Sequence, residues 1–206
     1  MWLDPKDFED YDKLHDLIKL GQEIVINPDG TPFDIKQVSK EFKQFIAEDS
    51  KDIDWESLTI YQKVPSIDII AHKIDPRYEL LKQKLSEVPA ITQAVINFIG
   101  PNSITPYHCD NQVYDTDIAT NTGVQASNVL GDTYQIMMGL YIPPFENGEI
   151  GLTFLHDNGA DTRGWRSGEI VAFDGSYDHS GWNKTNEVRI SLFIDVVQSS
   201  FKKTNE

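Results

Sequence analysis

Hydrophobic residues in the first ninety positions recur mainly at the spacing of amphipathic helices. A first helix is predicted where apolar side chains repeat every three or four residues, at Phe8, Tyr11, Leu14, Leu17 and Ile18. Two further helices follow from the same periodicity, one capped near Ser39 and one ended by Pro89. Their apolar positions are Val38, Phe42, Phe45 and Ile46, then Tyr78, Leu81, Leu85 and Val88. Residues 67–74 are apolar enough for a strand.

From residue 90 onward, short apolar runs alternate with turn signals, a pattern typical of β-sandwiches and barrels. The dipeptide Asn147-Gly148 is a hairpin signal. Residues 115–132 are polar and predict a long loop, and loops of this length often act as lids. We expect strands over residues 94–99, 104–109, 134–142, 151–155, 169–173 and 189–197.

The change of pattern near residue 90 predicts a change of layer, because no Gly/Ser-rich or Pro-rich spacer separates the two halves. We therefore expect one domain over residues 1–206. Residues 1–89 would form a mainly helical support and residues 90–200 the β core. A chain of 206 residues is long enough to bury such a core.

Composition narrows the classes of partner. The formal net charge of −15 argues against nucleic acid and against an anionic membrane surface. The single cysteine excludes an intramolecular disulfide. The first residues carry no basic segment followed by an apolar run, and no stretch approaches the roughly 20 apolar residues of a membrane helix. A cytoplasmic protein acting on a small molecule is the expectation, while the oligomeric state is not encoded in any pattern.

The main chemical signal is His108-Cys109-Asp110, followed by His179. Two imidazoles and one carboxylate are the ligand set of facial-triad iron(II) oxygenases. Side chains alternate along a strand, so His108 and Asp110 would share one face about 6 to 7 Å apart, with Cys109 pointing away. The competing interpretations are a solvated strand end and a turn histidine bonded to Asp178. The metal interpretation is favoured because His108 and Asp110 end an apolar strand.

Arg189 begins the last apolar run, ten residues after His179. The simplest alternative role is a surface ion pair, which would stabilise the fold little. If its side chain points inward, it needs an anionic partner, and its planar fork could grip a carboxylate with two hydrogen bonds. The remaining histidines, His15, His72 and His156, lie in no comparable pattern.

These residues resemble the aspartyl/asparaginyl β-hydroxylase family of iron(II)/2-oxoglutarate oxygenases. The similarity runs over about residues 88–196. It includes the segment Gly100-Pro101-Asn102-Ser103-Ile104-Thr105-Pro106-Tyr107-His108 and the run Gly139-Leu140-Tyr141-Ile142-Pro143. It continues with Trp165-Arg166-Ser167-Gly168-Glu169, Phe173-Asp174, His179, Trp182-Asn183 and Arg189.

The resemblance implies a fold that is mainly β with N-terminal helices, a double-stranded β-helix also called a jelly roll or cupin. It implies iron(II) held by His108, Asp110 and His179, and 2-oxoglutarate whose far carboxylate meets Arg189. Asn97 aligns with a position that contacts this cosubstrate in relatives. Many members have Arg-x-His where this chain has Gln135-Ile136-Met137, so Gln135 could contact the cosubstrate only as an uncharged donor.

The expected activity is oxygen-dependent hydroxylation of an unactivated C–H bond, with release of succinate and carbon dioxide. The substrate would be a free amino acid or an amino-acid side chain in a peptide, with Arg163 or Arg166 pairing its carboxylate. The carboxylate of Asp110 argues against a halogenase, which keeps that metal position open for halide. Two alternatives remain: a metal-dependent cupin that does not use 2-oxoglutarate, and a non-catalytic jelly-roll binding module.

Overall fold

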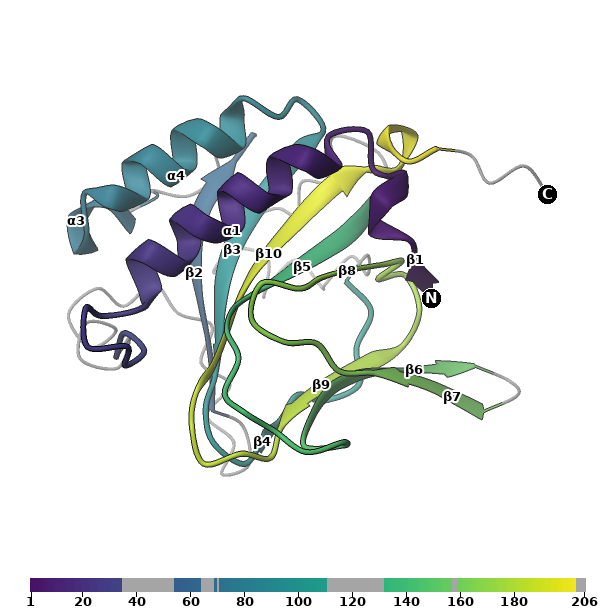
Figure 1. Cartoon of the computed structure of the whole chain (residues 1–206). Coiled ribbons are helices and arrows are strands. Elements are labelled where there is room, and N and C mark those ends of the chain that lie inside the picture. Colours follow the sequence, from purple (N-terminus) through teal and green to yellow (C-terminus); the bar gives the residue numbers. More distant parts are fainter. Residues whose placement is uncertain (35–53, 64–68, 70, 111–131, 157–158, 203–206) are drawn as a thin grey trace, which may run out of the picture.

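Two antiparallel sheets face each other, and helices cover the outer face of the larger one (Figure 1). The computed structural model describes residues 1–34, 54–63, 69, 71–110, 132–156 and 159–202. The elements in chain order are β1 (Trp2–Leu3), a 3₁₀ turn (Pro5–Asp7), α1 (Tyr11–Val25), β2 (Trp55–Gln62), α3 (Ala71–Ile74), α4 (Arg77–Ser86), β3 (Ile91–Ile99), β4 (Ser103–Ile104), β5 (Thr133–Tyr141), β6 (Ile150–His156), β7 (Gly159–Arg163), β8 (Ile170–Phe173), β9 (His179–Asn183), β10 (Arg189–Val197) and a second 3₁₀ turn (Gln198–Ser200).

The strand order identifies the fold. The large sheet has the order β1-β8-β5-β10-β3-β2, and the small sheet has the order β4-β9-β6-β7. From β3 to β10 the chain passes back and forth between the two sheets, with β6 and β7 as a pair within the small sheet. This winding is the jelly roll, so the prediction of a mainly β protein with a double-stranded β-helix is confirmed.

Side chains along β10 alternate between the helix-covered face of the large sheet and the face toward the small sheet. Ile190, Leu192, Ile194 and Val196 are fully buried and pack with the helices in the larger hydrophobic core. The residues between them, beginning with Arg189, point toward the small sheet, because successive side chains of a strand face opposite sides. On β10, the inner face therefore carries polar groups while the helix-covered face is apolar.

The helices form where their apolar spacing predicts them. On α1, six residues are buried at helical spacing, and Leu14, Leu17 and Val25 are at most 2% exposed. Each such side chain contributes roughly 1.5–3 kcal/mol on burial. On α4, Tyr78, Leu81 and Leu85 are buried, and the helix ends three residues before Pro89. None of the described helices is both long enough and apolar enough to cross a membrane.

The structure corrects several predicted elements. The apolar stretch 67–74 is not a strand where it is described, because Ala71–Ile74 is a short helix. The predicted strand 104–109 is reduced to β4 and one isolated bridge at His108. β2, β7 and β9 were not predicted as strands. The proposed helix around residues 38–46 and residues 115–131 of the predicted loop lie outside the described residues.

The dipeptide Asn147-Gly148 makes a turn but not the predicted hairpin. Gly148 has a positive φ of 89°, and the backbone of Glu149 donates to Glu146 at 3.1 Å. The strands before and after it, β5 and β6, belong to different sheets and do not pair. The turn therefore carries the chain from one sheet to the other, and the hairpin of the small sheet is formed by β6 and β7.

Candidate metal centre

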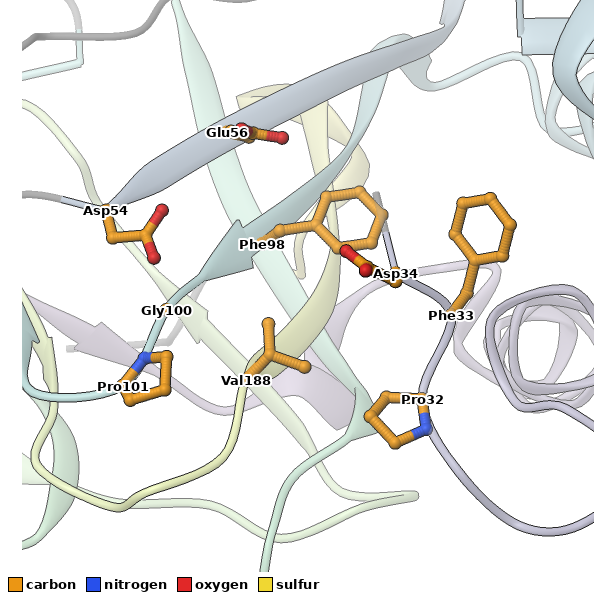
Figure 2. A pocket seen from close by; sticks show the side chains of 9 residues that line it. All are labelled: Pro32, Phe33, Asp34, Asp54, Glu56, Phe98, Gly100, Pro101 and Val188. Atoms are coloured by element: carbon orange, nitrogen blue, oxygen red, sulfur yellow. The ribbon is translucent and has the colours of Figure 1, made fainter. Parts of the chain in front are cut away.

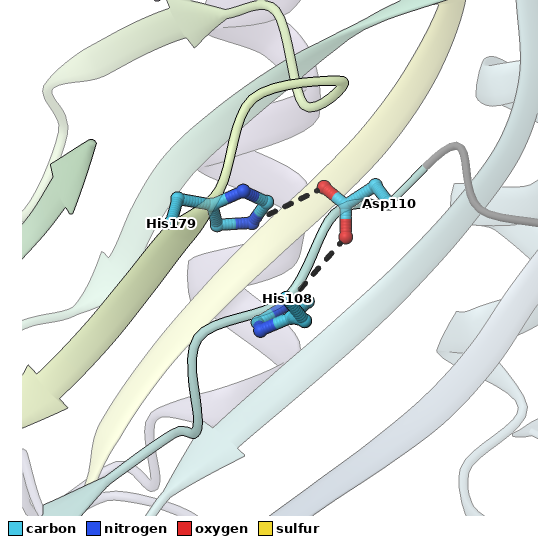
Figure 3. A group of neighbouring side chains, drawn as sticks. All are labelled: His108, Asp110 and His179. Carbon is cyan, nitrogen blue, oxygen red and sulfur yellow. Dashed lines mark ion pairs between the residues drawn. The ribbon is translucent and has the colours of Figure 1, made fainter. Parts of the chain in front are cut away.

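His108, Asp110 and His179 meet between the two sheets. Their ligand atoms all lie within 4.8 Å of one another. The Asp110 carboxylate reaches both imidazoles, with Oδ1 3.6 Å from Nε2 of His108 and Oδ2 3.5 Å from Nε2 of His179. Figure 3 shows the carboxylate facing both rings, with one oxygen toward each. Asp110 Oδ2 is buried and accepts no hydrogen bond from the described residues, which is the environment of an oxygen that a cation would satisfy.

Backbone pairing brings these distant residues together. The amides of His108 and His179 each donate to the other's carbonyl at 3.0 Å. Between β4 and this bridge, the Thr105 hydroxyl accepts from the amide of Gly181 at 2.8 Å. The Ser180 hydroxyl donates to the Thr105 carbonyl at 2.6 Å. The segment that carries His108 and Asp110 is thereby locked against β9 although it is not a continuous strand.

Alternation still holds within this short segment. Cys109, between the two ligand residues, is absent from the metal-ligand group, and its thiol donates to Asp178 Oδ1 at 2.9 Å. Burial first, and then Asp178, raises the pKa of the Cys109 thiol to about 11. The prediction that Cys109 faces away from the ligands is confirmed, and the thiol stays protonated at neutral pH.

Each histidine of the group is oriented by a main-chain carbonyl. Nδ1 of His108 lies 2.7 Å from the carbonyl of Pro106, and Nδ1 of His179 lies 2.9 Å from that of Tyr177. A carbonyl only accepts, so Nδ1 carries a proton in both rings, and the neutral form of each ring offers the Nε2 lone pair to a metal ion. Both Nε2 atoms face Asp110. This is the arrangement by which outer partners fix metal-binding imidazoles.

The surroundings of the group favour a neutral His179. Burial lowers the pKa of His179, an effect that Asp110 partly offsets. The rings of Phe154 and Phe173 lie 5.3 and 5.6 Å from the His179 ring. Burial also raises the pKa of Asp110, opposed by His179 and then His108. Without a cation, this carboxylate is held in an unfavourable charged state, and a bound metal ion would remove that cost.

Gly175 leaves room for Asp110. The Asp110 amide donates to the Gly175 carbonyl at 2.9 Å, while the Gly175 amide donates to Gln135 Oε1 at 2.6 Å. A Cβ on Gly175 would lie 2.4 Å from Gln135 Oε1 and 2.6 Å from Asp110 Oδ2. Any other residue would collide with both side chains, so this close approach requires glycine.

Gln135 in turn bonds Asp195, a carboxylate on the inner face of β10. Gln135 Nε2 donates to Asp195 Oδ1 at 3.1 Å. Burial, followed by the charge of Asp110, raises the pKa of Asp195 to about 7. Gln135 was predicted to contact a cosubstrate, but its amide oxygen and nitrogen are both engaged within the protein. Its role toward a cosubstrate stays a prediction.

Arg189 lies buried between the two sheets, with an exposed fraction of 2%. Its Nη1 donates to the carbonyls of Gly151 at 3.3 Å and Trp182 at 3.1 Å. The guanidinium carbon lies 4.7 Å from the centre of the Trp165 ring. Desolvation alone lowers its pKa, to about 9, and within the described part of the chain no carboxylate pairs with it. The charge is thus buried and lacks an anion.

Other donors near Arg189 also lack acceptors. The indole nitrogens of Trp55 and Trp165 and the hydroxyl of Ser191 are buried without a hydrogen-bond partner among the described residues. Asn97 pairs with Ser191 across β3 and β10, and its Oδ1 accepts from the Ser57 hydroxyl at 2.6 Å. That bond leaves the amide nitrogen of Asn97 as the group it can offer to a ligand.

The remaining candidates lie elsewhere. His15 packs its ring against Tyr11, and His72 and His156 are exposed. In the described residues the ligand group includes none of these three. Arg163 and Arg166 are exposed and lie over the rings of Trp2 and Phe145, at 4.8 and 4.9 Å. Trp2 packs edge-on against Phe154, so of the two arginines Arg163 is linked through ring contacts to the metal group.

Figure 2 shows a separate cavity of about 220 Å³. Phe98, one of its walls, belongs to the core on the helix side of the large sheet, and no member of the metal group lines it. Its lining consists of Pro32, Phe33, Asp34, Asp54, Glu56, Phe98, Gly100, Pro101 and Val188.

Sequence reasoning missed the roles of Gly175, Gly181 and Asp195. The glycines carry no recognisable signal, because their use depends on what lies opposite them in space. Asp195 did have a recognisable signal in the sequence. It is a charged residue within an apolar strand and so needs a partner, which is the argument that was applied to Arg189.

Solved structures with low sequence identity share similarity with this one. A Pseudomonas putida prolyl-4-hydroxylase matches with a TM-score of 0.43 and 12% identity, over 93% of this chain and 90% of that chain. A 2OG-Fe(II) oxygenase family oxidoreductase from Burkholderia pseudomallei matches with a TM-score of 0.44 and 12% identity, over 82% and 81%. An oxalate oxidase in complex with glycolate matches with a TM-score of 0.35 and 14% identity, over 53% and 43%.

Sequence comparison gives a short match and a long one. The ornithine lipid ester-linked acyl 2-hydroxylase of Rhizobium tropici is 41% identical over 34 residues, which span 16% of this chain and 12% of that protein. The aspartyl/asparaginyl β-hydroxylase profile matches residues 33–199, which include the three residues of the metal group and Arg189. The chain therefore belongs to the aspartyl/asparaginyl β-hydroxylase family.

Proposed function

We propose that this protein is an iron(II)- and 2-oxoglutarate-dependent hydroxylase that acts on a free amino acid or on an amino-acid side chain in a peptide. Its family supports hydroxylase activity. The choice of metal, cosubstrate and substrate rests on the donors and charges of the site.

The metal group fits iron(II). Two neutral imidazoles and one carboxylate, all on one side of the ion, are the donor set of non-haem iron oxygenases and leave further positions open. The orphaned Oδ2 of Asp110 and the two Nε2 lone pairs converge without any rearrangement of the backbone. In this proposal His108, Asp110 and His179 hold the metal, and the carbonyls of Pro106 and Tyr177 keep the imidazoles in the ligating tautomer.

The buried charge of Arg189 is the single observation that supports 2-oxoglutarate as the cosubstrate. A guanidinium that is 2% exposed and has no carboxylate among the described residues requires an anionic partner. The far carboxylate of 2-oxoglutarate would supply it through a bidentate pair. Ser191, Trp55 and Trp165 add buried donors that await acceptors. In a metal cupin that does not use 2-oxoglutarate, these buried donors would have no acceptor from that cosubstrate.

Iron(II) and 2-oxoglutarate, when bound, supply the oxygen chemistry that hydroxylates a C–H bond and releases succinate and carbon dioxide. The chain's own residues bind and orient. Arg189 fixes one end of the cosubstrate, and the three ligands fix the ion. Phe154 and Phe173 pack against His179 and exclude water from that side of the group.

A first test measures absorbance without oxygen. Adding iron(II) and 2-oxoglutarate to the purified protein should produce a weak charge-transfer band in the visible range, as chelation of the keto acid to iron does. The substrate can then be sought by mass spectrometry of free amino acids and short peptides, for a gain of 16 mass units coupled to succinate formation. Absence of the band under conditions in which a known relative shows it would refute the proposal.

A second test separates cosubstrate from metal. Arg189→Met keeps most of the side-chain volume but removes the charge. We expect 2-oxoglutarate affinity to fall at least about tenfold, because a charge-assisted hydrogen bond contributes roughly 1.5–3 kcal/mol. Metal affinity should be unchanged. Arg163→Met, at an exposed arginine, is the matched control. Equal loss of metal and 2-oxoglutarate binding in Arg189→Met would contradict the assignment.

A further inference from the structure

The inner face of the large sheet has two polar ends separated by an apolar band. Along β10 the inward positions are Arg189, Ser191, Phe193 and Asp195. Phe193 pairs with Val95 on β3 and Met137 on β5, so the middle of the face is apolar. Asp195 instead pairs with Gln93 and Gln135. Asp195 lies six residue steps along the strand from Arg189, which corresponds to about 20 Å.

Asp195 has a hydrogen bond but no cation. Gln135 Nε2 donates to Oδ1, and this donor is the one side-chain hydrogen bond to the carboxylate in the described residues. No lysine, arginine or histidine of these residues pairs with it, and the charge of Asp110, also negative, raises its pKa further. Asp195 is partly buried and its ionised form is disfavoured, so a cationic partner, which the described protein does not supply, would stabilise the carboxylate.

The Asp195 carboxylate lies at the end of the inner face that is next to the metal group. Gln135, which holds Asp195, also accepts from the amide of Gly175, and Gly175 lies directly against Asp110. A metal ion would neutralise Asp110, but Asp195 is not among the ligand atoms and would keep its charge. Arg189, at the other end, is assigned to the far carboxylate of 2-oxoglutarate in the proposed function.

We propose that Asp195 binds a protonated amine of the substrate and so presents the neighbouring carbon atoms to the metal centre. The inference rests on the proposed function for the identity of that centre. The ammonium group would meet the free oxygen of Asp195, while Gln135 fixes the other oxygen and thereby the orientation of the carboxylate. The substrate class is therefore a cationic amine, either a free amino acid or a peptide with an amino terminus or a lysine side chain.

Asp195→Asn separates recognition of charge from support of the fold. The amide oxygen of asparagine can still accept from Gln135, so the link to Gly175 and Asp110 is kept. The negative charge is lost. Asp16→Asn, at an exposed position on α1, removes one negative charge far from the inner face and serves as the matched control.

The experiment uses the full chain loaded with manganese(II) and 2-oxoglutarate, so that binding is measured without turnover. Loading is verified first by calorimetry, and failure at that step would refute the proposed function rather than the role of Asp195. The probes are free L-amino acids, lysine-containing peptides and peptides with a free amino terminus, each paired with its N-acetylated form. Acetylation removes the charge at the same site, and the free acids and the peptides distinguish the two sources of amine.

We expect at least one amine to bind, and its acetylated form to bind at least about 30-fold more weakly, because removing one partner of a desolvated charge pair costs about 2 kcal/mol or more. Asp195→Asn should abolish that preference with metal and 2-oxoglutarate binding retained, and Asp16→Asn should keep it. The proposal is overturned if no amine in the panel binds the loaded protein, if acetylated probes bind equally well, or if Asp195→Asn still prefers the charged form.

Discussion

A Cβ atom on Gly181 would lie 3.4 Å from Nη2 of Arg189 and 3.5 Å from Leu152. Gly181 follows His179 by two residues on β9, so its missing side chain belongs to the face that carries the ligand imidazole. The absence of a side chain there leaves space beside the buried guanidinium, on the side facing the metal group. The buried charge therefore comes from β10, and the space beside it comes from β9 in the facing sheet.

Gly181→Val should close this space. The two extra methyl groups would occupy the volume beside Arg189, and we expect 2-oxoglutarate binding to weaken at least about tenfold, with metal binding retained. Gly181→Ala adds only the Cβ, which stands at ordinary contact distance, and should have a much smaller effect. Calorimetric titration of 2-oxoglutarate into the metal-loaded variants measures both. If valine is tolerated as well as alanine, the cosubstrate does not pass beside Gly181.

His179→Ala should abolish metal binding. The variant removes one of two imidazole ligands and leaves the buried Oδ2 of Asp110 with one partner fewer. Protein purified without oxygen and loaded with iron(II) should contain about one equivalent of metal in the wild type and almost none in the variant. His156→Ala, at an exposed histidine on β6, controls for adventitious binding by surface imidazoles. Full metal content in His179→Ala would exclude it as a ligand.

Asp110→Asn should stabilise the metal-free protein and yet abolish metal binding. Burial raises the pKa of Asp110 in the folded state, so the ionised carboxylate costs folding free energy at every pH above its pKa in the unfolded chain. That cost begins to fall as the pH drops through the folded pKa and is gone below the unfolded pKa. Asparagine carries no charge at any pH and so does not incur this cost. Urea unfolding in the presence of a chelator should show a higher midpoint for the variant at pH 7.5, and a difference that shrinks in acid.

With metal present, the wild type should instead have the higher urea midpoint of the two. A bound ion stabilises only the wild type, by an amount that grows with metal concentration. A metal-free variant that is less stable than the wild type at pH 7.5 would show that Asp110 contributes folding energy of its own. It would then argue against a site built for a cation.

Asn183→Ala should destabilise the turn that precedes Arg189. The Asn183 amide nitrogen donates to the carbonyls of Ile99, Gly100 and Glu187 at 2.7 to 3.0 Å. Leaving such buried acceptors unpaired costs roughly 1–3 kcal/mol each when water cannot replace the donor, so a loss of at least about 2 kcal/mol is expected. Chemical denaturation measures it, with Asn147→Ala at an exposed turn as the control. A loss below about 0.5 kcal/mol would show that the clamp is dispensable.

Local pattern predicted a large part of the scaffold. The apolar spacing of α1 and α4 and the apolar runs of β3, β5, β6, β8 and β10 are visible in the chain, because the helices bury one face and these strands are largely buried. β9 was missed because its sequence, His-Ser-Gly-Trp-Asn, follows no apolar alternation; its burial comes from Thr105, Arg189 and the ligand group around it. β7 is mostly exposed and is a strand only because β6 pairs with it.

For the site, too, local sequence predicted one part and tertiary structure was needed for the other. The spacing of His108 and Asp110 was sufficient to predict that they share a face, since alternation is a property of two residues in sequence. The resemblance to relatives implied that His179 completes the group. Only the backbone pairing between the distant segments explains how His179 comes to lie beside the other two residues.

The sequence by itself determined which residue types could hold a metal and an anion, and which strands and helices would surround them. Tertiary structure alone decided that Gly175 and Gly181 leave space where Asp110 and Arg189 need it. It also decided that Asp195 lies beside the metal group without a cation among the described residues. The physical reason is that the energy of a buried charge depends on which groups pack around it. Those neighbours are set by the folded structure and not by the local sequence.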